Sequence, residues 1–395
     1  MNYIFFDTKR NYENLLPLTY TRPVSEIRIG IMTIKEKWEK LIETNFSNLT
    51  QDYLQEKFPV KIDEENILIN SSVLPNDDLI SEIKRLKLNS FLKKDNLILA
   101  VNLDYDGAEN FQNVNFLGLT AVEYYDNVTV IENLWDIFSL NGQEIEIDFK
   151  ILTKNRISKP ISRTNKVFNE ENIFIEEGAE VECAVLNAKD GYIYIGKDAV
   201  VMENVVIRGS LALCEHSQLK VGAVVYGPTT IGPFSKFGGE INNSVVFGYS
   251  NKAHDGFLGN SVIGEWCNIG AGSNNSNLKN NYEEVKLWNY RDQKFVKTGL
   301  QFCGLIMGDH SKCAINTMFN TGTVVGVSSN IYGAGFPRNF VSSFSWGGAH
   351  GFVEYNIQKA LATAQKVVNR RGIELSDVDK NILQHVFDLS VHNRK

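Results

Sequence analysis

The sequence contains few cysteines, no excess of positive charge and no long apolar run. Its five cysteines, in 395 residues, include no Cys-x-x-Cys pair, which argues against a disulfide framework and for reduced thiols. No apolar stretch approaches the roughly 18 residues of a membrane-spanning helix. The chain starts with strand-like residues rather than a secretory leader. We therefore expect a soluble, cytoplasmic protein with no membrane partner.

The charge balance is slightly acidic. Lys and Arg number 40 against 47 Asp and Glu, a formal net charge of −7. Such a balance argues against nucleic acid as the main partner. A small phosphorylated molecule stays possible, because it needs only a local basic site. Hydrophobic content of 43% and the length suit a globular protein of two or three domains.

The first 155 residues alternate between strand-like and helix-like stretches, which predicts an α/β domain with a mostly parallel sheet. Thr33 and Glu36 form a capping box for the first helix. Ligands of such folds bind where strands run into loops, so the loop from Asp7 to Thr33 is the candidate site. The expected strands are Tyr3–Phe6, Ile67–Ile69, Leu97–Val101 and Val128–Ile131, and the expected helices are Ile34–Ile42 and Leu79–Leu86.

That loop contains the run Leu-Pro-Leu-Thr-Tyr-Thr-Arg-Pro-Val at 16–24. It resembles the segment that opens the sugar-1-phosphate nucleotidyltransferases. The resemblance implies that Thr21, Arg22, Arg28 and Lys37 contact a nucleotide. It also implies a sugar phosphate and a nucleoside triphosphate as substrates, with Mg²⁺ as the metal.

The same region departs from the family pattern in three places. Residues 7–14 hold no glycine, Val24 stands where the family has a lysine, and Asn70 stands where a metal-binding aspartate is usual. Asp104 and Asp106 are possible substitutes, so the metal ligands stay unassigned. Two hypotheses remain open: a working nucleotidyltransferase, or a degenerate domain that binds or senses a sugar nucleotide.

Beyond a basic, Pro-containing linker at 156–166, aliphatic-Gly pairs recur at a six-residue step. Ile263-Gly264 and Ile269-Gly270 are examples, and this period predicts a parallel β-helix over 167–350. We expect roughly eight coils within 173–335, with a protruding hairpin near 279–298. Residues 351–395 have helical spacing, and we expect them to cover the open end of the β-helix.

A polar cluster around His254 interrupts the apolar pattern. The stretch 252–277 resembles the left-handed β-helix acyltransferases, in particular the acetyltransferase half of the GlmU family. That resemblance implies His254 as general base, Lys252, Asn268, Asn277 and Phe257 around the sugar, and Ala271 and Gly272 at acetyl-CoA. Phe257 replaces a tyrosine of the family, so the sugar substrate is open.

The resemblance as a whole implies a homotrimeric transferase that makes UDP-N-acetylglucosamine or a related sugar nucleotide. The alternative is acyltransferase activity alone, beside a first domain that only binds a sugar nucleotide. A surface histidine, a zinc site and a trimerisation stalk without chemistry are the other interpretations of the His254 region. The zinc site needs a close pair of histidines, and His216, His254 and His310 are far apart in the sequence.

Overall fold

The computed structural model describes residues 1–394 and divides the chain into two compact units. Unit 1 comprises 1–15, 21–27 and 32–133; unit 2 comprises 16–20, 28–31 and 134–395. Helices α5 (Asp136–Ser139) and α6 (Asn141–Thr153) thus group with the β-helix rather than with unit 1. Within residues 1–394, none of the helices combines the length and the apolar character that crossing a membrane requires.

Unit 1 is an α/β domain around one mixed sheet. β1 pairs in parallel with β4 and β5, whereas β7 is antiparallel to both β5 and β6. Val128–Ile131 is not a strand, since only Val130 makes an isolated bridge, to Val73. The expected capping box at Thr33 and Glu36 is confirmed. In sheet order the strands are β4 (Ser47–Leu49), β1 (Asn2–Phe6), β5 (Glu65–Asn70), β7 (Leu97–Asp104), β6 (Ser90–Lys94) and β8 (Thr120–Glu123), and the helices are α1 (Lys9–Asn14), α2 (Ile34–Ile42), α3 (Asp77–Lys84) and α4 (Tyr105–Glu109).

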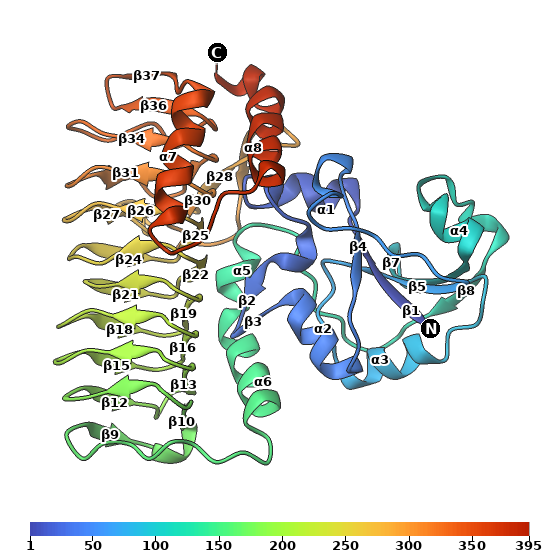
Figure 1. Cartoon of the computed structure of the whole chain (residues 1–395), viewed down its shortest axis with the longest axis horizontal. Helices are drawn as coiled ribbons and strands as arrows, with labels where there is room; N and C mark the ends of the chain where they lie inside the picture. Colours follow the sequence, from blue (N-terminus) through green and yellow to red (C-terminus); the bar gives the residue numbers. More distant parts are fainter. Residues whose placement is uncertain (395) are drawn as a thin grey trace. The chain divides into compact units, whose positions relative to one another are not determined.

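Unit 2 is a parallel β-helix of about ten turns, followed by two helices (Figure 1). The three faces of each coil stack on the same faces of the next coil, and aliphatic side chains fill the interior. The coils outnumber the expected eight, because they begin at β9 (Lys166–Phe168) and continue to β36 (Ser345–Gly348). We call the faces the first, second and third.

Each face is a ladder of short strands. The first face contains β10 (Ile173–Ile175), β13 (Ile193–Ile195), β16 (Leu211–Leu213), β19 (Thr229–Ile231), β22 (Val245–Gly248), β25 (Val262–Glu265), β30 (Leu305–Met307), β33 (Thr323–Val325) and β35 (Phe340–Val341). The second contains β11 (Glu180–Val181), β14 (Val200–Val201), β17 (Gln218–Leu219), β20 (Lys236–Phe237), β23 (Asn251–Lys252), β26 (Asn268–Ile269), β31 (Lys312–Cys313), β34 (Asn330–Ile331), β36 and β37 (Gly351–Glu354). The third contains β9, β12 (Val185–Asn187), β15 (Val206–Arg208), β18 (Val224–Tyr226), β21 (Glu240–Asn242) and β24 (Phe257–Gly259), and β27 (Asn274–Asn275) and β32 (Met318–Phe319) follow it.

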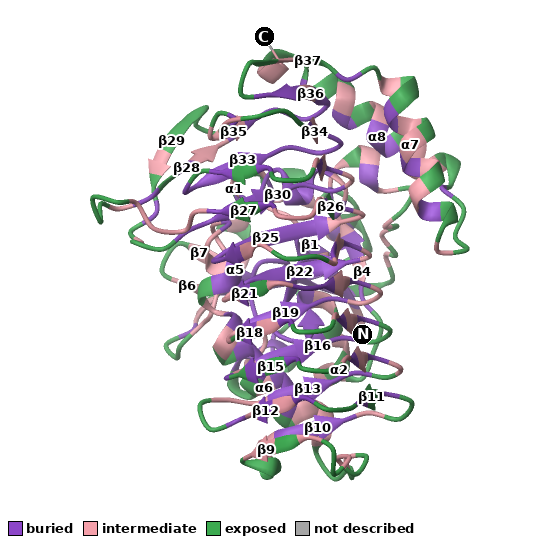
Figure 2. Cartoon of the chain, turned by 90° about the vertical axis from the view of Figure 1, so that its left-hand side faces the viewer, coloured by how far each residue is buried: buried purple, intermediate pink, exposed green. Residues whose placement is uncertain are grey.

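Three features complete unit 2. Strands β28 (Lys286–Asn289) and β29 (Lys294–Lys297) form an antiparallel hairpin beside the later coils (Figure 2). The last coil is closed by β37, which pairs antiparallel with β36. Helices α7 (Ile357–Asn369) and α8 (Asp377–Leu389) are capped by Asn356 and Ser376. α7 lies along the side of the coils, so the expectation that these helices cover the open end is wrong for α7 (Figure 1).

Candidate functional site

A cavity of ≈ 600 Å³ lies on the second face of the β-helix, between the coils and the end of α7. It contains three of the predicted site residues: His254, Asn268 and Ala271. The remaining lining comes from neighbouring coils and from α7: Lys236, Tyr249, Asn251, Ala253, Trp266, Cys267, Ile269, Gly270, Lys312, Ile315, Val367, Arg370 and Arg371.

His254 is exposed and lies in the corner that joins β23 to β24. The corner ends at Gly256, whose φ of 110° lies in a region that side-chain-bearing residues rarely adopt. Asn268 is the residue on the next coil that pairs with Asn251. Ala271 lies in the following corner, so consecutive coils bring the three predicted residues to one surface.

Four cations line the cavity, and no aspartate or glutamate is among its lining residues. Burial lowers the pKa of Lys312 to about 8. Burial and the nearby Arg371, Lys220 and Arg370 lower the pKa of Lys236. These charges repel one another without a carboxylate between them, so the cavity is suited to an anion with several negative groups.

The cations come from two sources. Lys236, Asn251, Asn268 and Lys312 occupy one outward-facing column, since each pairs with the next across adjacent strands. The arginines come from the C-terminal end of α7, and Arg371 Nη2 donates to Asn251 Oδ1 at 3.3 Å. That bond ties the helix end to the coil of His254.

Aromatic rings form one wall of the cavity. Tyr249 and Trp266 stack with their ring centroids 4.3 Å apart and 16° between their planes. They belong to a longer column of stacked rings that also includes His216, Phe234 and His310. A flat, apolar wall beside cations fits a ligand that carries both a ring and phosphate groups.

Backbone amides near Ala271 are available to a ligand. The amide of Gly270 donates to the carbonyl of Cys313 on the next coil, and the Ala271 carbonyl accepts from Asn316. Within the part of the chain that the structure describes, the amides of Ala271 and Gly272 have no acceptor. Gly272 has a φ of 68° and adjoins the cavity through Ala271.

Lys252 is not part of the cavity. Its side chain is buried inside the β-helix, and its ammonium donates to the carbonyls of Gly238, His254 and Asp255 at 3.0, 3.0 and 3.2 Å. Burial lowers its pKa to about 8. This position gives no support to the expected role of Lys252 at the substrate.

Phe257 and Asn277 form a separate cluster on the third face. Both lie over Gly259, where an ideal Cβ would be 2.4 Å from Phe257 Cζ and 2.8 Å from Asn277 Nδ2. Asn277 also donates to Asn260 Oδ1 at 2.8 Å. The two residues lie close together, but they do not line the cavity that contains His254.

The expected nucleotide-binding residues are divided between the units. Thr21, Arg22 and Lys37 belong to unit 1, where Arg22 and Lys37 are buried. Arg28 belongs to unit 2, and its guanidinium donates to the carbonyls of Phe247 and Ile31. These bonds hold a segment of the loop on the first face of the β-helix, which gives Arg28 a structural role.

The carboxylate nearest the end of β1 is already occupied by hydrogen bonds. Asp7 accepts from Ser71 Oγ, from Thr50 Oγ1 at 2.6 Å and from the amide of Val24 at 3.2 Å. Burial raises its pKa, and these bonds oppose the rise.

Other nearby side chains add no metal ligand set. Asn70 ends β5 and accepts from Ser72 Oγ at 2.9 Å, and Asp104 caps α4. No group of three or more His, Cys, Asp or Glu side chains with metal-binding geometry exists among residues 1–394. Mg²⁺ is usually held by one or two carboxylates together with substrate phosphates, so the metal ligands of unit 1 stay unassigned.

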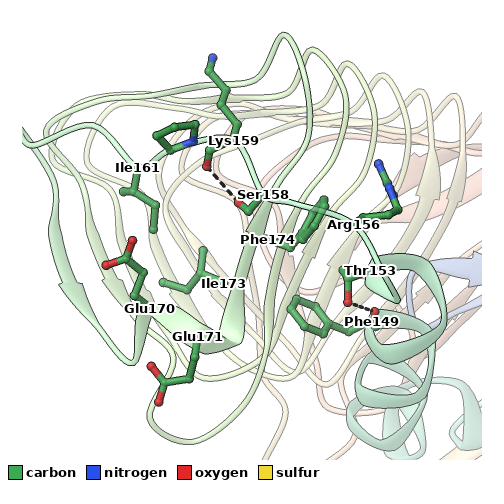
Figure 3. Close-up of a pocket in the computed structure, with 11 residues that line it drawn as sticks. Phe149, Thr153, Arg156, Ser158, Lys159, Ile161, Glu170, Glu171, Ile173 and Phe174 are labelled. Atoms are coloured by element: carbon green, nitrogen blue, oxygen red, sulfur yellow. Dashed lines mark hydrogen bonds between the residues drawn. The ribbon is translucent and has the colours of Figure 1, made fainter.

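A second cavity, of ≈ 360 Å³, lies at the start of the β-helix (Figure 3). Two of its cations are held by the protein itself: Arg156 forms an ion pair with Glu176, and Lys159 Nζ donates to the Ala179 carbonyl. Ile161 packs against the β-helix core. The basic linker thus contacts the first coil at these residues, while most of its other residues are exposed.

Sequence reasoning missed the four cations. Lys236 and Lys312 precede inward-facing residues of β20 and β31, just as Asn268 precedes Ile269, so the repeat period held a signal for them. Arg370 and Arg371 follow an amphipathic helix, and no pattern shows which coil that helix contacts.

Comparison with known proteins finds one matching family and several relatives of partial length. Residues 3–157 match the family of sugar nucleotidyl transferases. The chain is also 26% identical over 189 residues to a bifunctional sugar-1-phosphate nucleotidylyltransferase/acetyltransferase of Sulfurisphaera tokodaii, covering 42% of this chain and 47% of that protein. It is 28% identical over 245 residues to the bifunctional protein GlmU of Methanococcus aeolicus, covering 62% and 48%. The chain is similar to GlmU-type bifunctional proteins.

The extent of this similarity is partial. The chain spans about half the length of the curated relatives that it matches. Among solved structures, the acyltransferase LpxA of Bacteroides fragilis shares 13% identity, with coverage of 57% of this chain and 96% of that one, at a TM-score of 0.28. The likeness to GlmU-type proteins therefore rests on sequence.

Proposed function

We propose that the β-helix transfers an acyl group from an acyl-CoA thioester to the amino group of a phosphorylated sugar. The observation that carries this proposal is the cavity, which combines His254 with four cations and no carboxylate. Both proposed substrates carry phosphate groups, and the cations supply their counter-charge. Acetyl-CoA and glucosamine-1-phosphate are the pair we propose first, on the similarity to GlmU-type proteins.

The chemistry needs a proton acceptor and a place for negative charge. His254 takes a proton from the sugar ammonium, and the free amine attacks the thioester carbonyl. The carbonyl oxygen becomes negative, and the amides of Ala271 and Gly272 are the donors we assign to it. The attacking nitrogen then releases its extra proton to solvent, the carbon–sulfur bond breaks, and His254 returns its proton to the sulfur, so that CoA leaves as a thiol and the sugar keeps the acyl group as an amide.

The test is an acyl-transfer assay on the full chain with acetyl-CoA and glucosamine-1-phosphate, following free CoA. We expect His254→Ala to lower kcat at least ~100-fold, the usual contribution of a general base, with little change in KM for acetyl-CoA. His216→Ala is the matched control, because this histidine is exposed on the β-helix but lies outside the cavity. Full activity of His254→Ala would contradict the mechanism.

For unit 1 we propose binding of a sugar nucleotide without metal-dependent turnover. The observation in favour is that Asn70 occupies the expected metal position and that the oxygens of Asp7 already accept hydrogen bonds. The similarity to sugar nucleotidyl transferases supplies the ligand class.

Calorimetry with UTP and UDP-N-acetylglucosamine, paired with a pyrophosphate-release assay, tests this second proposal. The assay uses UTP, N-acetylglucosamine-1-phosphate and Mg²⁺. We expect binding without pyrophosphate from the wild type, and a gain of Mg²⁺ binding in Asn70→Asp. Steady pyrophosphate release by the wild type would instead establish unit 1 as a working nucleotidyltransferase.

A further inference from the structure

A charged side chain, that of Lys252, lies in the apolar interior of the β-helix next to the corner that carries His254. On the second face, the inward-facing column runs through Leu219, Phe237 and then Lys252, which pairs with Phe237 in register. Later members of the column are Ile269 and Cys313. Lys252 is 1% exposed. An ammonium in such a place is unfavourable unless its donors are satisfied, so its hydrogen-bond partners show which part of the backbone it supports.

The donors are fully satisfied by backbone. A lysine ammonium has three N–H donors, and Lys252 Nζ makes three bonds, to the carbonyls of Gly238, His254 and Asp255. Gly238 lies in the corner of the preceding coil, whereas the other two carbonyls belong to the corner that carries His254. The ammonium therefore joins two consecutive corners from inside.

The His254 corner and the preceding Gly238–Gly239 corner share a backbone feature: the positive φ falls on the residue directly before the third-face strand, Gly239 before β21 and Gly256 before β24. In four other corners of the same edge the third residue is left-handed, with φ between 56° and 72°: Asn204, Gly222, Gly272 and Asn316. Three of these donate their amides to the preceding corner: Asn204 to Cys183, Gly222 to Glu203 and Asn316 to Ala271. In the His254 corner the third residue, Asp255, is not left-handed, and the positive φ falls on Gly256 instead.

The usual backbone bonds of a corner are thus replaced here by bonds to a side chain. The carbonyl of His254 accepts from Lys252 inside its own coil, and that of Asp255 does the same. His254, in this corner, is among the lining residues of the cavity.

We propose that Lys252 is a positioning residue, whose internal ammonium holds the His254 corner in the conformation that presents the imidazole to the cavity. The proposal rests on the proposed acyl transfer for its catalytic meaning. It assigns no contact between Lys252 and substrate, in contrast to the role expected from sequence.

Lys252→Met tests the proposal, because methionine keeps an unbranched chain in the apolar column but donates no hydrogen bond. Leu219→Met is the matched control, a volume-conserving change in the same column. Hydrogen exchange of peptides covering 250–259 reports on the corner without any substrate. Melting temperature and oligomeric state report on the fold.

We expect Lys252→Met to speed exchange in the corner at least ~10-fold, since it removes bonds to a charged donor, and to leave exchange in other coils unchanged. We also expect kcat for acyl transfer to fall ~10-fold or more, because the imidazole of His254 would no longer be held in position for proton transfer. The KM for acetyl-CoA should be retained. Leu219→Met should change neither quantity.

Unchanged exchange in the Lys252→Met corner would overturn the proposal, as would faster exchange together with an unchanged kcat. Loss of exchange protection throughout the β-helix would also overturn it, because Lys252 would then support the whole coil rather than the corner. If the wild type shows no acyl transfer but Lys252→Met speeds hydrogen exchange in the 250–259 peptides as expected, the proposed function fails and the structural role of Lys252 stands.

Discussion

At the scale of single residues, Lys312 is a partly buried cation in the wall of the cavity. Its ammonium donates to the carbonyl of His310 at 2.7 Å, and burial lowers its pKa to about 8. A lysine with that pKa is mostly charged at pH 7 and loses its charge as the pH rises through 8. The positive potential of the cavity therefore depends on pH within a range that is easily measured.

We expect the affinity of the protein for CoA to fall as the pH rises from 7 to 9. The charged ammonium of Lys312 attracts the phosphate groups of CoA, and its deprotonation above pH 8 removes that attraction. Lys312→Met should bind CoA ~10- to 100-fold more weakly at pH 7, the loss of a charged hydrogen bond, and the difference from wild type should nearly vanish by pH 9.5. Calorimetry at several pH values checks this. An equal pH dependence in both proteins would contradict it.

The grouping of site residues was predictable from sequence where the motif is continuous, whereas their roles stay predictions. His254, Asn268 and Ala271 lie within two consecutive coils, and the structure brings them to one cavity. Lys312 was not predicted, because the hairpin of β28 and β29 separates it from Asn268 in the sequence, although the two pair in register. Lys252 was predicted beside the substrate on the family resemblance, although it occupies the inward-facing position of its repeat, in register with Phe237.

At the scale of elements, α7 determines where the arginines lie. The chain leaves the last coils at Tyr355, whose amide donates to Phe344 and whose ring contacts Trp346. The 13 residues of α7 span about 20 Å at 1.5 Å each. Strand spacing is about 4.8 Å, so this length covers the four steps between β36 and β23. The helix length thus matches the position of Arg371 beside Asn251.

We expect the double variant Arg370→Ala/Arg371→Ala to weaken CoA binding at least ~10-fold, since each arginine removes a charged donor for phosphate. Its binding should also depend less on salt concentration. Lys359→Ala/Lys366→Ala removes the same charge from exposed positions of α7 outside the cavity, and should leave affinity within about twofold. Equal losses in the two double variants would show a general charge effect instead of a site.

The boundaries of helices were more predictable than their packing. Thr33 with Glu36 and Ser376 with Asp379 cap α2 and α8 as the capping pattern indicates. Such signals are local, because they satisfy backbone groups within one turn. The contact of α7 with the side of the coils depends on tertiary packing. The wrong strand prediction at Val128–Ile131 has the same cause, because this apolar run pairs with the sheet domain through a single bridge and does not form a strand.

At the scale of the whole molecule, the third face of the β-helix carries exposed apolar side chains. Val206, Tyr226 and Met318 point outward from β15, β18 and β32, and they are 37%, 41% and 37% exposed. Val185, Val206 and Val224 are successive neighbours in register, and the row ends at Glu240 on the next coil. We take this short apolar row as the candidate contact between copies, since closed symmetry favours a ring of identical copies.

We expect the protein to be a homotrimer in solution, with a mass near three times 44.6 kDa in sedimentation equilibrium. Val206→Glu/Tyr226→Glu places like charges where the third faces of three copies meet, and burying them is unfavourable, so this variant should sediment as a monomer. Val221→Glu is the control, because Val221 is 62% exposed but lies in a corner, between β17 and β18. A wild type that sediments as a monomer would contradict the expectation, and a trimer that survives the double variant would move the contact to another face. Because His254 and the four cations all belong to one chain, we expect a monomeric variant to keep CoA binding, measured by calorimetry, whereas a trimer that shares the site between copies would lose it on dissociation.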